Sequence, residues 1–232
     1  LDTGNSKLNW GIYGQRYTWD GAAVGGQMKI FDETGARDPG YEHHNSNYDY
    51  MNAQDHKSEE TDPAIAITSS GSFVVTWRDK DVTTTPHIRA RRYDASGNDL
   101  GVFTVEGSHG AAGNQHEPAV AMLDAGQFVI TWRGADDIFA RTFSADGSAA
   151  SATFRVNQTT SGNQSAPSVA MYPDGQFLVS WQGEGSGDDA GIFGRYYHAD
   201  GSPRSAEFRI NSVTSGNQYS PAIAMGQSDR HH

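Results

Sequence analysis

A segment of 18 residues occurs twice in the chain in nearly the same form, and this repetition constrains the fold more than any other feature. FRVNQTTSGNQSAPSVAM begins at Phe154, and FRINSVTSGNQYSPAIAM begins at Phe208. The last part of that segment recurs four times, as PAIAI, PAVAM, PSVAM and PAIAM, beginning at Pro63, Pro118, Pro167 and Pro221. Repeats of roughly 40 to 55 residues are typical of β-propellers and repeat arrays.

Three further blocks recur in a fixed order after this first one, block a. Block b ends in tryptophan (FVVTW, FVITW, FLVSW), at Trp77, Trp132 and Trp181. Block c (IYGQRY, IRARRY, IFARTF, IFGRYY) begins at Ile12, Ile88, Ile138 and Ile192. Block d (MKIF, FTVE, FRVN, FRIN) begins at Met28, Phe103, Phe154 and Phe208. Short β-branched or aromatic runs bounded by Gly, Asp, Ser or Pro are typical of strands. With no sustained helical period, the sequence predicts an all-β fold.

The connections between blocks differ in constancy. The separation between the Pro of block a and the Trp of block b is always 14 residues (63 to 77, 118 to 132, 167 to 181). The separation between the Ile of block c and the following turn Gly is always nine (88 to 97, 138 to 147, 192 to 201). The b–c and d–a connections vary. Successive turns of an antiparallel sheet lie on alternate edges. Because binding residues concentrate in variable loops on a constant scaffold, we predict a binding face at the b–c and d–a edge.

The chain begins near a block c and ends on a lone block a, and these broken ends are complementary. They favour a four-bladed β-propeller whose last blade is shared by both termini, with SKLNW, ending at Trp10, as the only candidate for its block b. The alternative is a fragment of a larger propeller or repeat array. We expect one repeat domain, 1–230, and interpret His231 and His232 as a tag remnant. The domain has four units, 12–62, 63–117, 118–166 and 167–220, followed by a closing strand at 221–225. The insertion, 36–61, lies within the first unit.

Composition limits the partners. The formal net charge of −11 argues against nucleic acid, which needs clustered Lys and Arg. The absence of cysteine excludes disulfides and thiolate zinc sites. No apolar run approaches the roughly 18 residues of a membrane span, so no membrane insertion is expected. The beginning LDTG suggests a piece of a longer polypeptide.

The repeated residues have structural and functional interpretations. The Trp of block b faces the small central residue of block c on the next sheet if sheets pack face to face; the alternative is a sugar-stacking platform. The repeated Arg of block c is interpreted as a structural salt bridge or aromatic stack. Three glutamines precede their Pro by three residues, and a Gln amide either ties down loop backbone or binds a hydroxylated ligand. These candidate ligand residues are Gln115, Gln164 and Gln218.

Each complete unit carries an acidic pair just before block c. Paired carboxylates in Gly-rich loops are candidate Ca²⁺ ligands, since this ion takes six to eight oxygens; the alternative is solvated hairpin tips. The pairs are Asp79 with Asp81, Asp136 with Asp137, and Asp188 with Asp189.

The insertion gathers aromatic and imidazole side chains that no other unit has. A long insertion in an economical repeat has a functional or a capping role, and His with Tyr can act as base and acid in a polysaccharide lyase or hydrolase. The candidate ligand residues are Tyr41, His43, His44, Tyr48 and His56.

From FRVN through TTSGNQSAPSVAM to DGQFLVSWQGEGSGDDAGIFGRYYHADG, the sequence resembles a tandem β-repeat of very large secreted or surface adhesin-like proteins of Gram-negative bacteria, of the RTX type. The resemblance covers the chain except for the insertion. It implies secretion or a cell-surface location, adhesion or glycan contact, and calcium-rich surroundings, and it assigns no catalytic residue. We therefore expect a non-catalytic module that binds a surface glycan or protein partner. The alternatives are a structural spacer of a giant adhesin and a polysaccharide-acting enzyme.

Overall fold

The computed structural model describes residues 11–18, 20–32, 59–80, 85–106 and 113–225, and these residues form antiparallel sheets joined by turns. We number the sheets as blades I to IV. Blade I has two strands, β1 (Gly11–Tyr17) and β2 (Ala23–Asp32). Blade II contains β3 (Glu59–Ile67), β4 (Phe73–Lys80), β5 (His87–Tyr93) and β6 (Asp99–Thr104). Blade III contains β7 (Gln115–Met122), β8 (Phe128–Gly134), β9 (Asp137–Phe143) and β10 (Phe154–Arg155). Blade IV contains β11 (Ser165–Met171), β12 (Phe177–Gly185), β13 (Asp188–Tyr197) and β14 (Phe208–Arg209).

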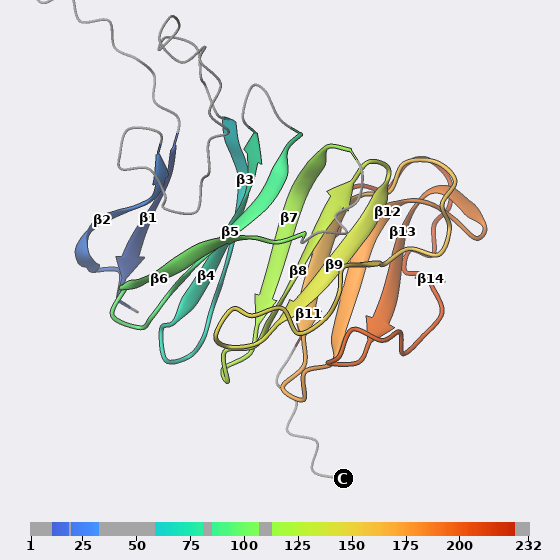
Figure 1. The fold of residues 1–232 in the computed structure, drawn as a ribbon. Coiled ribbons are helices and arrows are strands. Elements are labelled where there is room, and N and C mark those ends of the chain that lie inside the picture. The colour runs from blue at the N-terminus through green and yellow to red at the C-terminus, as the bar shows by residue number, and fades with distance from the viewer. Residues whose placement is uncertain (1–10, 19, 33–58, 81–84, 107–112, 226–232) are drawn as a thin grey trace, which may run out of the picture.

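The blades stand face to face in a fan (Figure 1). Within each four-stranded blade the strands pair in chain order. The first strands of blades II, III and IV, which are β3, β7 and β11, contact one another from blade to blade. A fan of meander sheets whose first strands adjoin is the arrangement of a β-propeller, and the predicted all-β propeller class is confirmed.

The a–b and c–d turns repeat one geometry. In each, a glycine N–H donates to the carbonyl three residues earlier, as Gly126 does to Leu123 (2.8 Å) and Gly147 to Ser144 (2.9 Å). Both glycines have positive φ, 92° and 85°. A side chain is strained in that conformation, which explains why these turns keep glycine in every copy.

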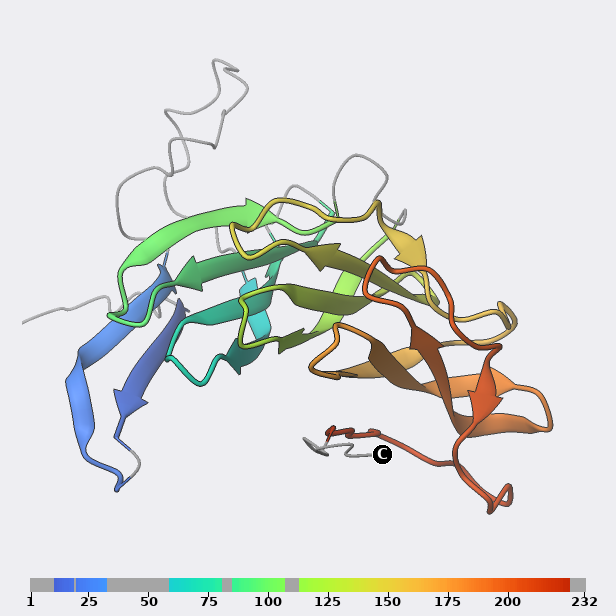
Figure 2. The same cartoon turned by 90° about the horizontal axis from the view of Figure 1, so that it is seen from below.

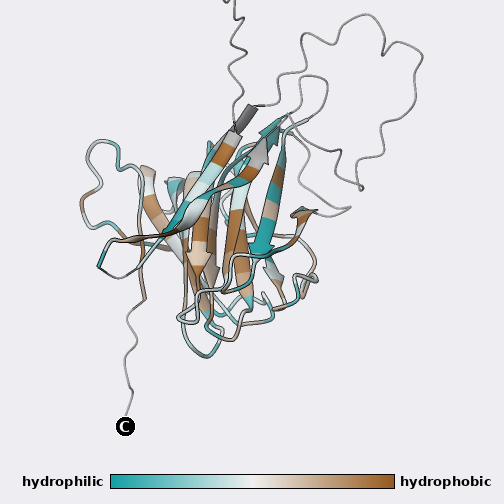
Figure 3. Cartoon of the chain, turned by 90° about the vertical axis from the view of Figure 1, so that its left-hand side faces the viewer, coloured by the Kyte–Doolittle hydropathy of each residue, from teal (hydrophilic) through white to brown (hydrophobic). Residues whose placement is uncertain are grey.

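The cores lie between the blades. In β8 the alternation of the strand points Phe128, Ile130 and Trp132 toward blade II, and the equivalent side chains of β12 point toward blade III. Trp77, Trp132 and Trp181 are fully buried. Trp132 shares its cluster with Ala90. Trp181 shares its cluster with Ala140, so the predicted packing of Trp near a small residue of the preceding blade is confirmed at these two boundaries. Figure 3 shows the hydrophobic residues along the strands of the fan.

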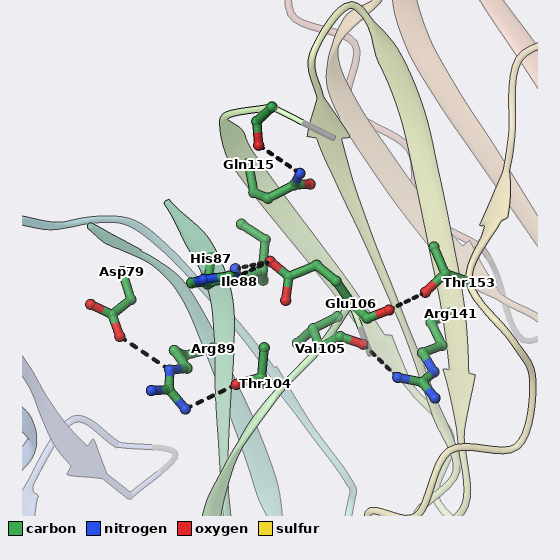
Figure 4. A network of polar contacts seen from close by, with 11 residues as sticks. Asp79, His87, Ile88, Arg89, Thr104, Val105, Glu106, Gln115, Arg141 and Thr153 are labelled. Atoms are coloured by element: carbon green, nitrogen blue, oxygen red, sulfur yellow. Dashed lines mark hydrogen bonds and ion pairs between the residues drawn. The ribbon is translucent and has the colours of Figure 1, made fainter. Parts of the chain in front are cut away.

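An arginine crosses each of the three described blade boundaries. Arg141 donates to the main-chain oxygen of Val105 (2.9 Å), and Arg195 donates to that of Val156 (3.0 Å). Arg91 makes the same contact with the oxygen of Ile30 (2.7 Å). Figure 4 shows the Arg141 contact. The repeated Arg of block c therefore joins neighbouring blades through main-chain oxygens.

Two expectations about boundaries are corrected. The predicted closing strand 221–225 forms no strand and does not pair with β1, so the two-stranded blade I gains no strand from it. It lies instead beside blade IV, where the Ile223 N–H donates to Ser168 Oγ (3.2 Å), because its nearest partners in space are those of the preceding repeat. Figure 2 shows this segment apart from β1 and β2. The predicted insertion spans 36–61, but residues 59–61 pair with β4 as part of β3.

Candidate functional site

Two pockets recur at equivalent places between blades, at the edge that carries the a–b and c–d turns. The first, of about 240 Å³, lies between blades II and III, and its walls include Ser72, Asp94, Gly126 and Ala145. The second, of about 270 Å³, lies between blades III and IV. Because the units repeat, residues at equivalent positions of successive units line both pockets. Neither pocket lies at the variable-loop edge, where the sequence predicted the binding face.

Each pocket is lined by a stacked pair of aromatic residues and by polar side chains. The rings of Phe73 and Tyr93, which line the first pocket, stack at 4.6 Å, and those of Phe128 and Phe143, which line the second, stack at 4.9 Å. All four rings are buried and pack toward the preceding blade. At the rim of the first, a hydrogen bond from the Asn98 side chain lowers the pKa of Asp94, so its carboxylate stays charged. Such a pocket offers hydroxyl and carboxylate groups to a ligand, whereas its aromatic rings are buried in the core.

The rims of the two pockets differ where the copies diverge. Arg92 lines the first pocket, and its guanidinium reaches the carbonyl of Ala145 in the next blade (3.2 Å). Thr142 stands at the equivalent position of the second pocket. The first pocket therefore carries a cation that the second lacks, and the two need not bind a ligand equally well.

The repeated glutamines lie at the opposite edge and bind the protein itself. Gln164 is fully buried. Its amide donates to the carbonyls of Ser161 (3.0 Å) and Glu184 (3.1 Å), and its oxygen accepts from the indole N–H of Trp181 (3.0 Å). Gln115 is buried and donates to Gly113 O (3.0 Å). Gln218 is half-buried and donates to Gly216 O (3.0 Å). Of the two roles left open by the sequence, the structure shows backbone tying.

The acidic residues are held by side chains of the following block d. Asp137 and Asp188 begin strands β9 and β13. The amide of Asn157 donates to Asp137 (2.6 Å), and that of Asn211 donates to Asp188 (2.7 Å). The oxygens of the same two amides accept the first main-chain N–H groups of block c, at Ile138 and Ile192, both at 2.8 Å. These two aspartates therefore hold the residues that fix the start of block c.

Blade II makes this contact with its donor and acceptor exchanged. The carboxylate of Glu106 takes the place of the asparagine oxygen and accepts from Ile88 N–H (2.6 Å), and His87 stands where blade III has Asp137. His87 Nδ1 lies 3.6 Å from Glu106 Oε1 (Figure 4). The hydrogen bond to Glu106 raises the pKa of His87. A carboxylate cannot donate as an asparagine amide does, so its neighbour has to be a donor.

The remaining predicted calcium ligands are dispersed. Asp79, within β4, pairs with Arg89 at 3.1 Å, whereas Asp136 and Asp189 are exposed. Asp81 lies outside the described residues. Among the residues that the structure describes, no three His, Asp or Glu side chains gather as a metal site would require. The calcium site therefore stays a prediction.

The insertion residues Tyr41, His43, His44, Tyr48 and His56 also lie outside the described residues. No sequence pattern predicted the inter-blade pockets, although the a–b and c–d turns at the edge where they lie have constant lengths in this chain. Differences in loop length indicate a binding site at the variable loops. These pockets arise instead where equivalent turns of two neighbouring blades lie side by side, which loop length does not indicate. None of the described residues forms a helix long and apolar enough to cross a membrane.

Comparisons with known proteins leave the family open. No family model matches the sequence, and no curated protein matches it. Among solved structures, the chain is similar to the GH43_1 enzyme from Xanthomonas citri complexed with xylose (13% identity, TM-score 0.41, 67% of this chain and 58% of that one). It is also similar to a thermostable family-43 glycoside hydrolase (10%, 0.46, 71% and 58%) and to the Hadza microbial sialidase Hz136 (13%, 0.46, 66% and 37%). The chain spans less than two thirds of the length of each. At these identities and TM-scores the likeness assigns no activity.

Proposed function

We propose that the protein is a non-catalytic binding module that recognises a glycan, within a secreted or cell-surface protein. The observation that carries this proposal is the recurrence of one pocket, at equivalent positions, at two successive blade boundaries. Repeated sites suit a repeated ligand, because several weak contacts to one polysaccharide act together as a multivalent attachment.

The chemistry of the pockets supports a sugar as the ligand. A sugar ring has hydroxyl groups around its edge and apolar C–H groups on its faces. The first pocket places Ser70, Ser72 and Asp94 at its wall, and the second has Gln127, Thr142 and Ser144. Hydroxyl and amide groups donate and accept the hydrogen bonds that sugar hydroxyls need, and a carboxylate accepts them. A volume of about 240 Å³ falls just below the usual range for drug-sized ligands and suits one sugar unit.

A glycan array probed with the whole protein, followed by calorimetry, tests the proposal. Ser72→Ala and Gln127→Ala each remove a hydrogen-bonding side chain from one pocket and leave the turn backbone intact. We expect each to weaken its site about two- to tenfold, the worth of one hydrogen bond. Ser161→Ala, on the opposite edge, is the matched control and should bind like the wild type. Binding that ignores both pocket variants, or an array without any ligand, contradicts the proposal.

A second candidate, the structural spacer, is favoured by a different observation. The repeated polar residues hold the blades themselves, as Arg141, Asn157 and Gln164 do. If the protein is a spacer, no glycan on the array should bind, and substitutions of these residues should strongly destabilise the fold. The polysaccharide-acting lyase or hydrolase rests on residues of the insertion that the structure does not describe, and assays for cleavage of array-positive glycans, by elimination or by hydrolysis, would test it.

A further inference from the structure

The far face of blade IV repeats the surface that blades II and III present to the next blade. In blades II and III this receiving surface consists of the second residue of block b, the first and third residues of block c, and the third residue of block d. The set in blade III is Val129, Ile138, Ala140 and Val156, all fully buried. The equivalent set in blade IV is Leu178, Ile192, Gly194 and Ile210.

In blade IV this surface is open. Ile210 is 45% exposed, whereas its equivalents Val105 and Val156 are fully buried. Leu178 and Ile192 are each only half-buried. What covers the surface in the earlier blades is block b of the following unit, which supplies Phe, an aliphatic residue and Trp from one face of a strand. Among the described residues, no block b follows blade IV.

The segment 221–225 already occupies the place of the next block a. In each copy the residue before the block-a proline has positive φ, which is uncommon for any residue other than glycine. These residues are Asp62 (55°), Glu117 (52°), Ala166 (50°) and Ser220 (52°). Ser220 N–H donates to Gln182 Oε1 (2.7 Å), and Ile223 N–H donates to Ser168 Oγ (3.2 Å). The fourth copy thus keeps the positive φ of the other three at this residue, while no strand pairs with it in the described part of the chain.

We infer that blade IV and residues 221–225 form a docking site for one extended peptide strand with the pattern Phe-x-Val/Ile-x-Trp. The strand would pair with 221–225 as β8 pairs with β7, where Val120 faces Ile130 and Met122 faces Phe128. Its Trp would lie over Gly194, as Trp181 lies in one cluster with Ala140. Main-chain pairing supplies affinity in such strand addition, and alternate side chains supply specificity. The occupant is therefore a polypeptide strand that completes the blade.

Binding of a fluorescent peptide tests the inference. The peptide QFVITWRG copies residues 127–134 of the chain, and its matched control QVFTIWRG has the same composition but places Phe and Trp on opposite faces of a strand. We expect the first peptide to bind at least about tenfold more tightly, since losing one large apolar contact costs this much. Equal binding of the two peptides, or none by either, overturns the inference.

Variants of the protein locate the site. Ile210→Asp should weaken binding about tenfold or more, because it places a charge in the apolar contact. Val213→Asp is the matched control, since Val213 is 62% exposed and lies outside the receiving surface; it should bind like the wild type.

Changes in the amide NMR shifts of the wild-type protein on addition of the peptide supply a readout that does not depend on a variant folding. They should concentrate at 221–225 and around Ile192 and Ile210, and shifts elsewhere contradict the site. Sedimentation of the protein alone tests a second copy as occupant, and self-association that blocks the peptide would overturn the assignment.

Discussion

The guanidinium of Arg141 on β9 donates a 2.9 Å hydrogen bond to the main-chain oxygen of Val105, which belongs to the preceding blade. The same guanidinium binds Ser151 O (3.1 Å) and lies 5.7 Å from the centre of the Phe143 ring. One side chain therefore fixes the c–d connection of its own blade and ties that blade to its neighbour. Arg91 and Arg195 make the corresponding inter-blade contacts, so blade stacking does not depend on apolar packing alone.

Replacing Arg141 should destabilise the boundary between blades II and III. Arg141→Ala leaves the carbonyls of the buried Val105 and the half-buried Ser151 without this donor, and we expect the free energy of unfolding to fall by about 1–3 kcal/mol. Urea unfolding measures the change. Arg204→Ala is the control, since Arg204 is exposed and contacts the Tyr196 ring at 5.9 Å; its effect should stay within about 0.5 kcal/mol. An equal loss in the two variants would argue against a special role for Arg141.

Removing the Gln164 amide should also destabilise the protein. Gln164→Leu keeps most of the volume but deprives the Trp181 indole N–H and the carbonyls of Ser161 and Glu184 of their partner, for an expected loss of about 2 kcal/mol or more. Gln218→Leu should cost less, because Gln218 is only half-buried and water can replace its contacts. Thermal unfolding and Trp fluorescence of both variants check the order, and the opposite order would contradict it.

Protonation of His87 should stabilise the folded state. The Glu106 hydrogen bond raises the pKa of His87 above its usual 6.5. A raised folded-state pKa gives a contribution that is complete below the unfolded pKa and is lost as the pH rises through the folded value. NMR titration should place the His87 pKa above 6.5, and the stability advantage over His87→Asn should shrink from about pH 5.5 to pH 8. A pKa at or below 6.5 would refute this pairing.

The donor–acceptor exchange in blade II predicts a coupled pair. His87→Asp alone sets a second carboxylate beside the buried Glu106 and should destabilise blade II by about 1–3 kcal/mol at neutral pH. Adding Glu106→Asn recreates the Asp137–Asn157 pairing of blade III and should recover most of the loss. A double-mutant cycle by urea unfolding measures the coupling, expected at about 1–2 kcal/mol. Strictly additive effects would show that the two positions are independent.

Calcium should not act through Asp188 unless the ion displaces an existing bond. Its carboxylate is buried and already accepts from Asn211 and from the Ala190 N–H (3.1 Å). We expect Asp188→Asn to lower the melting temperature by the same amount with EDTA and with millimolar calcium. The exposed Asp189→Asn should have little effect in either condition. A calcium-dependent rise that Asp189→Asn abolishes would instead establish the ligand role expected from the sequence.

The sequence by itself determined the repeat unit. Strand positions, turn glycines such as Gly147 and the packing of Trp132 near Ala90 follow from local pattern, because a strand has a period of two and a tight turn needs positive φ at one position. Copies of one unit must also stack alike, so the face-to-face cores were predictable from a single alignment of the blocks.

Only the tertiary structure decided what the repeated polar groups bind. The sequence left Gln164 open between loop backbone and ligand, and it gave the aspartates no partners, because Asn211 lies 23 residues beyond Asp188 along the chain. Closure of the ring was likewise undecided by complementary ends, and residues 221–225 lie beside Ser168 rather than β1. Hydrogen bonds between repeats and pockets at blade boundaries depend on the rotation of one sheet against the next, which no local pattern encodes.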